Sequence, residues 1–254
     1  MADEVLVEVA DATLVITLNR PEARNAVDRA TAEQVADALV RLDEDPELSA
    51  GIITGAGGTF CAGMDLKAFV RGERPQVADR GFAGLTEAPP DKPLIAAVEG
   101  YALAGGCEVA LACDLIVAGR NANFGIPEVK RGLVAAAGGL VRLPRRIPQQ
   151  IAMELALTGD FLDAERAERL GLVNHLCEDG QALATAKELA ARITANAPLA
   201  LQVSKRVIRD SYTWSDDEWG QRQLPHITEV MQSEDAIEGS KAFAEKRAPR
   251  WTGR

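Results

Sequence analysis

The feature that most constrains the fold is a change of pattern near residue 140. Before it, short apolar runs rich in β-branched residues alternate with stretches of helical periodicity; the clearest runs are VLVEV (5–9), TLVITL (13–18), SAGIIT (49–54), LIAAV (94–98) and DLIVAG (114–119). After it come five runs that all have helical periodicity: 149–157, 163–170, 181–196, 198–210 and 215–232. Strands that alternate with helices are typical of an α/β core, whereas helices alone indicate a helical C-terminal part.

Local signals refine this outline. The turn at 10–12 predicts a hairpin between the first two strands. A helix follows to about Asp43, and either Asp28 or Thr31 is able to cap it. The stretch 70–92 is polar, with Gly, Pro and mixed charge, which predicts a mobile surface segment.

Composition excludes several classes of protein. The chain is 47% hydrophobic but only 4% aromatic, so its core must be built mainly from Ala, Val, Leu and Ile. A net charge of −10 argues against nucleic acid as a partner. The acidic start MADEV does not resemble a signal peptide, and no apolar run reaches the ~20 residues of a membrane helix. We therefore expect a cytoplasmic protein with no membrane partner.

Cysteine and histidine give no sign of a metal site. The four cysteines form no CxxC pair, which favours reduced, buried thiols: Cys61, Cys107, Cys113 and Cys177. The two histidines, His175 and His226, are far apart in sequence and we expect each to be structural. The sequence thus predicts no metal.

The segment GYALAGGCEVALACD (100–114) is the first candidate for chemistry. Gly105 and Gly106 allow a sharp turn after a strand, and a helix that starts there presents unpaired N–H groups at its positive end. Such donors suit an anion, including one that exists only in a transition state. The alternative is a tight turn with Glu108 merely stabilising the first helical turn by ~0.3–1 kcal/mol.

Two further motifs have the same ambiguity. One interpretation of FCAGMDL (60–66) is that the Met64 N–H faces a cleft. The other is that the motif is a plain turn in which Asp65 caps the next helix. In FGIPEVKRG (124–132), Pro127 stiffens the backbone beside Glu128. That carboxylate either transfers protons or is a surface group beside two basic residues.

Taken together, the three motifs indicate one reaction site. Two N–H donors stabilise the enolate-like oxygen that develops when an α,β-unsaturated thioester reacts. Two carboxylates supply the base and acid that split water, and their proximity raises the pKa of one of them.

Over nearly its whole length the chain resembles the enoyl-CoA hydratase/isomerase (crotonase) superfamily. Six pieces carry the resemblance, in the order typical of the family: LNRPEARNAV (18–27), FCAGMDL (60–66), KPLIAAVEGYALAGGCEVALACDLIVA (92–118), FGIPEVKRGL (124–133), GGLVRLPRRI (138–147) and LTGDFLDAERAERLGLVN (157–174). The resemblance implies an α/β fold, a spiral of ββα repeats. Its core with the active site would span 1–195, and helices in 196–254 would build trimers or dimers of trimers.

The resemblance also implies roles for particular residues. The N–H groups of Met64 and Gly105 would form the oxyanion hole, and Glu108 and Glu128 would hold and split water. The CoA thioester would bind along a path lined by Ala23, Arg24, Ala62, Gly63, Met64, Asp65, Leu66, Gly105 and Gly106. No cofactor is implied, because CoA enters as part of the substrate. The basic C-terminal tail would either approach the CoA phosphates or be a solvated end.

The implied activity is that of an enoyl-CoA hydratase, a lyase of acyl-CoA and fatty acid metabolism. The stretch LVAAAGG (133–139) lacks the Pro that many hydratases have there, and the 70–91 loop is short. Both departures concern the pocket for the acyl group, so the sequence does not define the chain length or polarity of the substrate's acyl group. The alternatives are an isomerase, a dehydratase of another hydroxyacyl-CoA, or a non-catalytic acyl-CoA-binding relative.

Overall fold

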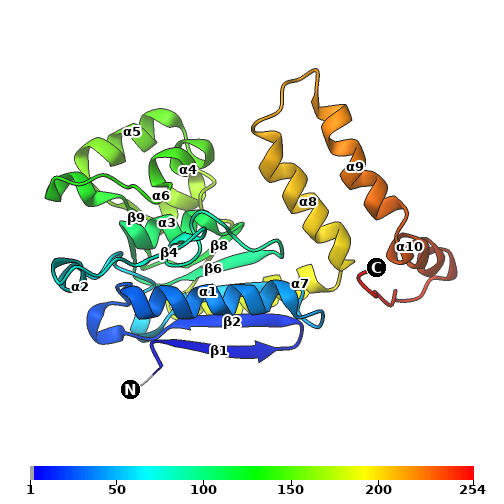
Figure 1. Cartoon of the computed structure of the whole chain (residues 1–254), viewed down its shortest axis with the longest axis horizontal. Coiled ribbons are helices and arrows are strands. Elements are labelled where there is room, and N and C mark those ends of the chain that lie inside the picture. Colours follow the sequence, from blue (N-terminus) through cyan, green and yellow to red (C-terminus); the bar gives the residue numbers. More distant parts are fainter. Residues whose placement is uncertain (1–2) are drawn as a thin grey trace.

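A six-stranded sheet forms the centre of the molecule (Figure 1). The computed structural model of the chain describes residues 3–254. The sheet is ordered β1-β2-β3-β6-β8-β11, with these bounds: β1 Val5–Ala10, β2 Thr13–Leu18, β3 Ala50–Gly55, β6 Leu94–Val98, β8 Leu115–Gly119 and β11 His175–Cys177. The first two strands form the predicted antiparallel hairpin, and every later neighbour is parallel. The α/β class predicted from the strand–helix alternation is confirmed.

A smaller sheet lies beside the first and positions the site. It has the order β10-β9-β7, with β7 Tyr101–Leu103, β9 Asn123–Gly125 and β10 Leu162–Asp163. Helix α3 (Gly105–Ala112) begins one residue after β7, and the 3₁₀ helix η3 (Pro127–Arg131) begins one residue after Gly125. Because β7 and β9 pair in parallel, the chain leaves both strands at the same edge.

The remaining helices cover the sheets or extend beyond them. Their bounds are η1 Pro21–Ala23, α1 Arg29–Glu44, η2 Ala56–Gly58, α2 Leu66–Val70, α4 Gly139–Arg146, α5 Gln149–Thr158, α6 Ala164–Arg169, α7 Ala182–Thr194, α8 Pro198–Ser211, α9 Trp219–Met231 and α10 Glu234–Glu245. Asp28 is the cap of α1, since its carboxylate accepts a hydrogen bond from the Thr31 N–H. The sequence analysis did not predict α4 or α10.

The two faces of the sheet have separate cores. Alternate residues of β2 point to opposite faces: Leu14 and Ile16 pack toward α1, and Val15 packs toward α7. The core is mostly aliphatic, as the composition requires. Three of the four cysteines are buried, Cys177 is half-buried, and all four are free thiols.

The prediction of a mobile surface segment over 70–92 is wrong for its middle part. Residues 76–77 and 81–82 pair as the short strands β4 (Gln76–Val77) and β5 (Gly81–Phe82). Phe82 and Leu85 are buried in the main core. The glycines and mixed charges in this segment form tight turns rather than a detached loop.

Helices α8 to α10 lie to one side of the core, with the C-terminus near α10 (Figure 1). α8 is attached to the core by Lys205, whose ammonium lies 2.7 Å from the Asp114 carboxylate. The predicted boundary between 195 and 196 stays a prediction, and residues 1 and 2 of the predicted first domain lie outside the described residues. None of the helices in the described part of the chain has the length and apolarity that crossing a membrane requires.

Candidate active site

The start of α3 is shaped by an unusual backbone conformation. Ala104 has φ 51° and ψ −127°, a region that residues other than Gly rarely adopt. Its N–H donates to the Gly125 carbonyl at 2.8 Å, which ties the turn to β9. The Gly105 N–H comes next, as the first residue of the helix, and has no acceptor within residues 3–254.

Both glycines of α3 are required by close packing. A Cβ on Gly105 would lie 2.5 Å from the Phe82 ring, and one on Gly106 would lie 2.1 Å from the Cys61 carbonyl oxygen. No side chain fits at either position without moving its neighbour. The two glycines thus let α3 approach the segments that carry Cys61 and Phe82.

A second free N–H lies beside the first. Gly63 has φ +98°, and a Cβ placed on it would lie 3.1 Å from the Gly105 nitrogen. The Gly63 carbonyl accepts from Val27, and the Asp65 N–H donates to the Val27 carbonyl. Between them, the Met64 N–H has no acceptor in the part of the chain that the structure describes. The N–H groups of Met64 and Gly105 are therefore two unused donors at the point where the Gly63 backbone lies next to Gly105.

The predicted cap at Asp65 is confirmed and has a partner that sequence reasoning missed. Its carboxylate accepts from the N–H groups of Lys67 and Ala68 and lies 3.0 Å from the Arg20 guanidinium. Partial burial raises the pKa of this carboxyl, but the bond from Ala68 and the charge of Arg20 outweigh burial and hold the pKa below its usual range. Asp65 is therefore a fixed anion directly after Met64.

The predicted CoA path is partly assembled by backbone contacts. The Ala62 N–H donates to the Arg24 carbonyl at 3.0 Å, which places Ala23–Arg24 beside the 60–66 segment. Arg24 is exposed and has φ 54°, and Leu66 is 45% exposed at the start of α2. Arg24 and Leu66 are thus exposed parts of a rim formed by the 23–24 and 62–66 segments, the second of which contains Met64.

Glu108 is buried and held by two backbone donors. Its Oε1 accepts from the N–H groups of Ala137 at 2.7 Å and Gly139 at 2.8 Å. Burial raises the pKa of Glu108 to about 7, and the nearby Glu128 carboxylate contributes to the rise, while the Gly139 bond and the Arg142 charge oppose it. A carboxyl group with this pKa accepts and releases protons near neutral pH.

Glu128 is not the surface group that one interpretation of its motif favoured. It lies half-buried in η3, and its Oε2 is buried without a hydrogen-bond partner in the described chain. Burial raises its pKa as well. Lys130, which follows it, is paired with Asp160 at 2.9 Å instead. The structure therefore brings a second carboxyl group with a raised pKa close to Glu108.

Sequence reasoning missed the groups that support this arrangement: Arg20, Phe82, Ala137, Gly139 and Arg142. Arg20, Gly139 and Arg142 lie in pieces that carry the family resemblance, but no local pattern linked them to Asp65 or Glu108. Phe82 was hidden in the segment that we expected to be mobile.

The C-terminal tail is bound within its own chain. The Arg247 guanidinium contacts Glu238 at 2.6 Å and Glu245 at 2.7 Å, and the Trp251 indole donates to the Ala195 carbonyl. The basic charge of Arg247 is thus already paired on α10. An approach of the tail to CoA phosphates stays a prediction.

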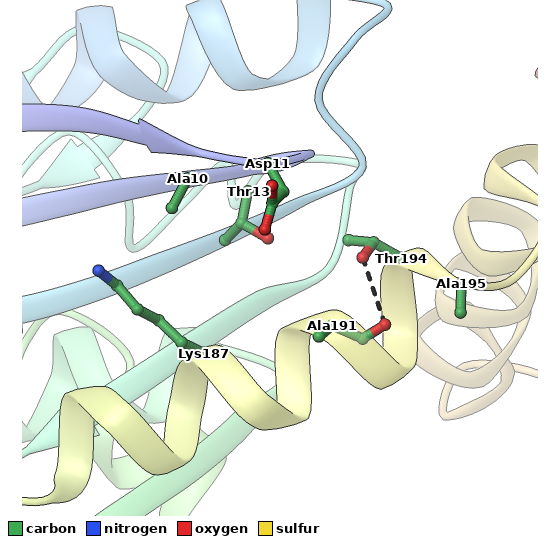
Figure 2. Close-up of a pocket in the computed structure, with 7 residues that line it drawn as sticks. All are labelled: Ala10, Asp11, Thr13, Lys187, Ala191, Thr194 and Ala195. Atoms are coloured by element: carbon green, nitrogen blue, oxygen red, sulfur yellow. Dashed lines mark hydrogen bonds between the residues drawn. The ribbon is translucent and has the colours of Figure 1, made fainter.

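A separate pocket of about 250 Å³ lies between the β1–β2 turn and α7 (Figure 2). Lys187 extends from α7 toward the hairpin, and Asp11 lies on the turn (Figure 2). The pocket contains none of the residues described above, so it is not part of this site.

The candidate site thus contains two free N–H donors and two neighbouring carboxyl groups with raised pKa values, and comparison with known proteins shows the class of protein. A family model described as enoyl-CoA hydratase/isomerase matches residues 8–254. The chain belongs to this family, with the crotonase fold.

Particular relatives carry two kinds of name. An enoyl-CoA hydratase from Mycobacterium tuberculosis H37Rv has a solved structure that superposes with a TM-score of 0.98 at 62% identity, covering 99% of this chain and 100% of the other. A carnitinyl-CoA dehydratase from Salmonella typhi is 46% identical over 250 residues, 95% of each chain. A carnitinyl-CoA hydratase structure from Mycobacterium avium has 48% identity, full coverage of both chains and a TM-score of 0.80.

Proposed function

We propose that this chain is an enoyl-CoA hydratase that adds water reversibly across a trans-2-enoyl-CoA double bond to give a 3-hydroxyacyl-CoA. The observation that carries the proposal is the pair of buried carboxyl groups with raised pKa values, Glu108 and Glu128, beside an α3 N-terminus with a free N–H. Water addition needs one carboxylate to take a proton and one carboxylic acid to give one.

In this proposal the thioester oxygen accepts hydrogen bonds from Met64 and Gly105. Negative charge that develops on this oxygen is stabilised by the two N–H groups and by the positive end of α3. The ionised glutamate takes a proton from water as its oxygen bonds to C3, and the protonated one delivers its proton to C2. One proton is taken and one is given, so the pair regenerates without a cofactor.

The CoA part would lie along the rim made by Ala23, Arg24, Ala62, Gly63, Asp65 and Leu66 together with Gly106. Backbone bonds join Ala62 to Arg24, and Gly63 and Asp65 to Val27, and these bonds support this part of the proposal. The polyanionic CoA would meet Arg24 there, although the whole chain is acidic.

A second candidate is the dehydration of carnitinyl-CoA, the reverse reaction on a 3-hydroxyacyl-CoA with a quaternary ammonium group. The names of the Salmonella and M. avium relatives favour it. Both candidates use the same two glutamates, so they differ only in the acyl group.

The test measures loss of the enoyl-thioester ultraviolet absorbance with crotonyl-CoA, and its gain with carnitinyl-CoA. We expect Glu108→Gln and Glu128→Gln each to lower kcat by at least ~10² while the circular dichroism stays native. The ratio of kcat/KM for the two substrates decides between the candidates. Near-normal turnover by both variants would contradict the water-activating roles, and binding without turnover by the wild type would favour a non-catalytic relative. Migration of the double bond would favour an isomerase.

We also propose that α8 to α10 contact further copies of this chain. Large apolar side chains on these helices are exposed in the single chain: Ile208, Trp219, Leu224, Met231, Ile237 and Phe243. An apolar face of this extent favours association. Light scattering on the purified protein would give the mass, and a monomer at micromolar concentration would contradict the proposal.

A further inference from the structure

Arg142 of α4 lies beside the backbone that holds Glu108. Its Nη1 donates to the Ala137 carbonyl at 3.2 Å, and the Ala137 N–H in turn donates to Glu108. A Cβ on Gly138 would lie 2.0 Å from this same Nη1, so the guanidinium lies directly against the turn. Arg142 therefore supports the peptide groups whose N–H donors hold the carboxylate.

The other nitrogen of the guanidinium contacts the segment before β6. Its Nη2 donates to the Thr86 carbonyl at 2.5 Å. Thr86 belongs to the buried segment in which Phe82 packs on Gly105. One side chain thus joins the turn that holds Glu108 to the segment that supports the Gly105 N–H.

The charge of Arg142 also faces Glu108. The Arg142 side chain is half-buried. Burial lowers the pKa of its guanidinium and the charge of Arg146 lowers that pKa further, whereas the Glu108 carboxylate raises it. An arginine stays protonated in such a setting, so the charge is permanent. Neither of the other basic groups of α4 replaces it: Arg145 lies over the Tyr212 ring, and Arg146 donates to the Cys113 carbonyl.

We propose that Arg142 is a positioning residue, which holds the Ala137–Gly139 turn against Glu108 and stabilises the ionised form of that carboxylate. The proposal deepens the proposed function and rests on it for its effect on rate. The groups that face Glu108 are Glu128 from η3 and Arg142 from α4, with Cys107 beside it on α3 and Arg146 facing the same interior. Among them, Arg142 is the cation that opposes the pKa rise of Glu108.

The first test does not depend on turnover. The infrared carbonyl band of protonated carboxyl groups is titrated in the wild type, and the band missing in Glu108→Gln is assigned to Glu108. In Arg142→Gln we expect the titration midpoint of Glu108 to move upward by about 1 pH unit, because an opposing charge is lost. The matched control is Arg145→Gln, which removes a charge from the exposed side of the same helix, and its midpoint should stay where it is in the wild type. An unchanged midpoint in Arg142→Gln would overturn the proposal.

The second test is the pH profile of kcat for hydration. The two glutamates work when they hold one proton between them. A higher pKa of Glu108 shifts this condition to higher pH, so the kcat profile of Arg142→Gln should move to higher pH. A lower rate with an unshifted profile would indicate a merely structural role and overturn the proposal. If the wild type hydrates no enoyl-CoA, the proposed function fails, but the infrared titration still decides the case of Arg142.

Arg142→Lys provides a further check if the Gln variant does not fold. Lysine keeps the positive charge but lacks the planar guanidinium that donates to the Ala137 and Thr86 carbonyl groups at the same time. We expect a midpoint close to that of the wild type together with a kcat lowered by about tenfold or more. Wild-type kcat in this variant would overturn the positioning role.

Discussion

Helices α3 and α9 have the same backbone geometry but opposite surroundings. All eight residues of α3 are buried, whereas none of the thirteen residues of α9 is buried in the single chain. The sequence of α3 is determined by its neighbours, because main chain approaches it from several sides. The residues of α9 have no such constraint within this chain, and the helix contains Gly220 and Pro225. Identical substitutions in the two helices should therefore have opposite effects.

The largest effect is expected for Gly106→Ala in α3. The new Cβ would lie 2.1 Å from the Cys61 carbonyl oxygen and 2.8 Å from its carbon, and both are main-chain atoms. The backbone must move to accept the methyl group, at a cost of at least ~3 kcal/mol. Urea denaturation and soluble yield would measure this. A variant as stable as the wild type would show that α3 is less tightly packed than its burial indicates.

The second prediction concerns function more than stability. In Gly63→Ala the methyl group would lie 3.1 Å from the Gly105 nitrogen and 3.0 Å from the Ala104 Cβ, and φ is +98°. We expect the two N–H donors to move apart and hydration to slow by about 10²–10³, the effect of losing one oxyanion donor.

The control for Gly63→Ala is Gly58→Ala. Gly58 also has a positive φ, +74°, but no atom of a non-neighbouring residue lies within 4 Å of the position that its added methyl group would take. This variant has the backbone strain without the contact at the site. Equal rate losses in the two variants would mean that strain, rather than displacement of the Gly105 N–H, causes the effect.

How far the sequence predicted these regions depends on the range of the interactions. The hairpin, strands β3, β6 and β8, and helices α5 to α9 have local periodicity, and all were predicted. The short strands β4, β5, β7 and β9 to β11 have too few residues to show a period and were not predicted. Helix α4 was missed because it follows a glycine with positive φ, contains Pro144 and has no side-chain cap. Helix α10 was also missed, although Ser233 caps it and gave a local signal.

The candidate site shows the same limit. Its glycines and glutamates were found because turns and charges are visible along the chain. The pairing of Glu108 with the N–H groups of Ala137 and Gly139 joins residues about thirty positions apart, and no periodicity encodes it. The Arg20–Asp65 pair spans forty-five positions and was missed for the same reason.

The third prediction compares a partly buried carboxylate, Asp65, with an exposed one, Asp216. Asp65→Asn removes one of the charges that face Arg20, and we expect a loss of about 1–2 kcal/mol in the free energy of unfolding at pH 7. The pKa of Asp65 is lowered in the folded state, so its stabilisation is present above the unfolded pKa and is lost as pH falls through the folded pKa. The difference between variant and wild type should therefore shrink below about pH 4.

Urea denaturation between pH 7 and pH 3 would measure this difference. The control is Asp216→Asn in the exposed connection between α8 and α9, where the carboxylate has no hydrogen bond or ion pair to the described residues. It should change stability by less than ~0.5 kcal/mol at any pH. A pH-independent loss in Asp65→Asn would show that the hydrogen-bonding geometry, rather than the charge, stabilises this turn.

The smallest effect, and the only stabilising one, is expected for Gly220→Ala in α9. No atom outside the helix backbone lies within 4 Å of the added methyl group, and the residue is already helical. Alanine restricts the unfolded chain and favours the helix, so stability should rise by about 0.5 kcal/mol. Thermal unfolding at several protein concentrations would measure the gain and show whether it depends on association. A loss of stability that grows with protein concentration would mean that another copy packs against Gly220, and α9 would then resemble α3 in being determined by its neighbours.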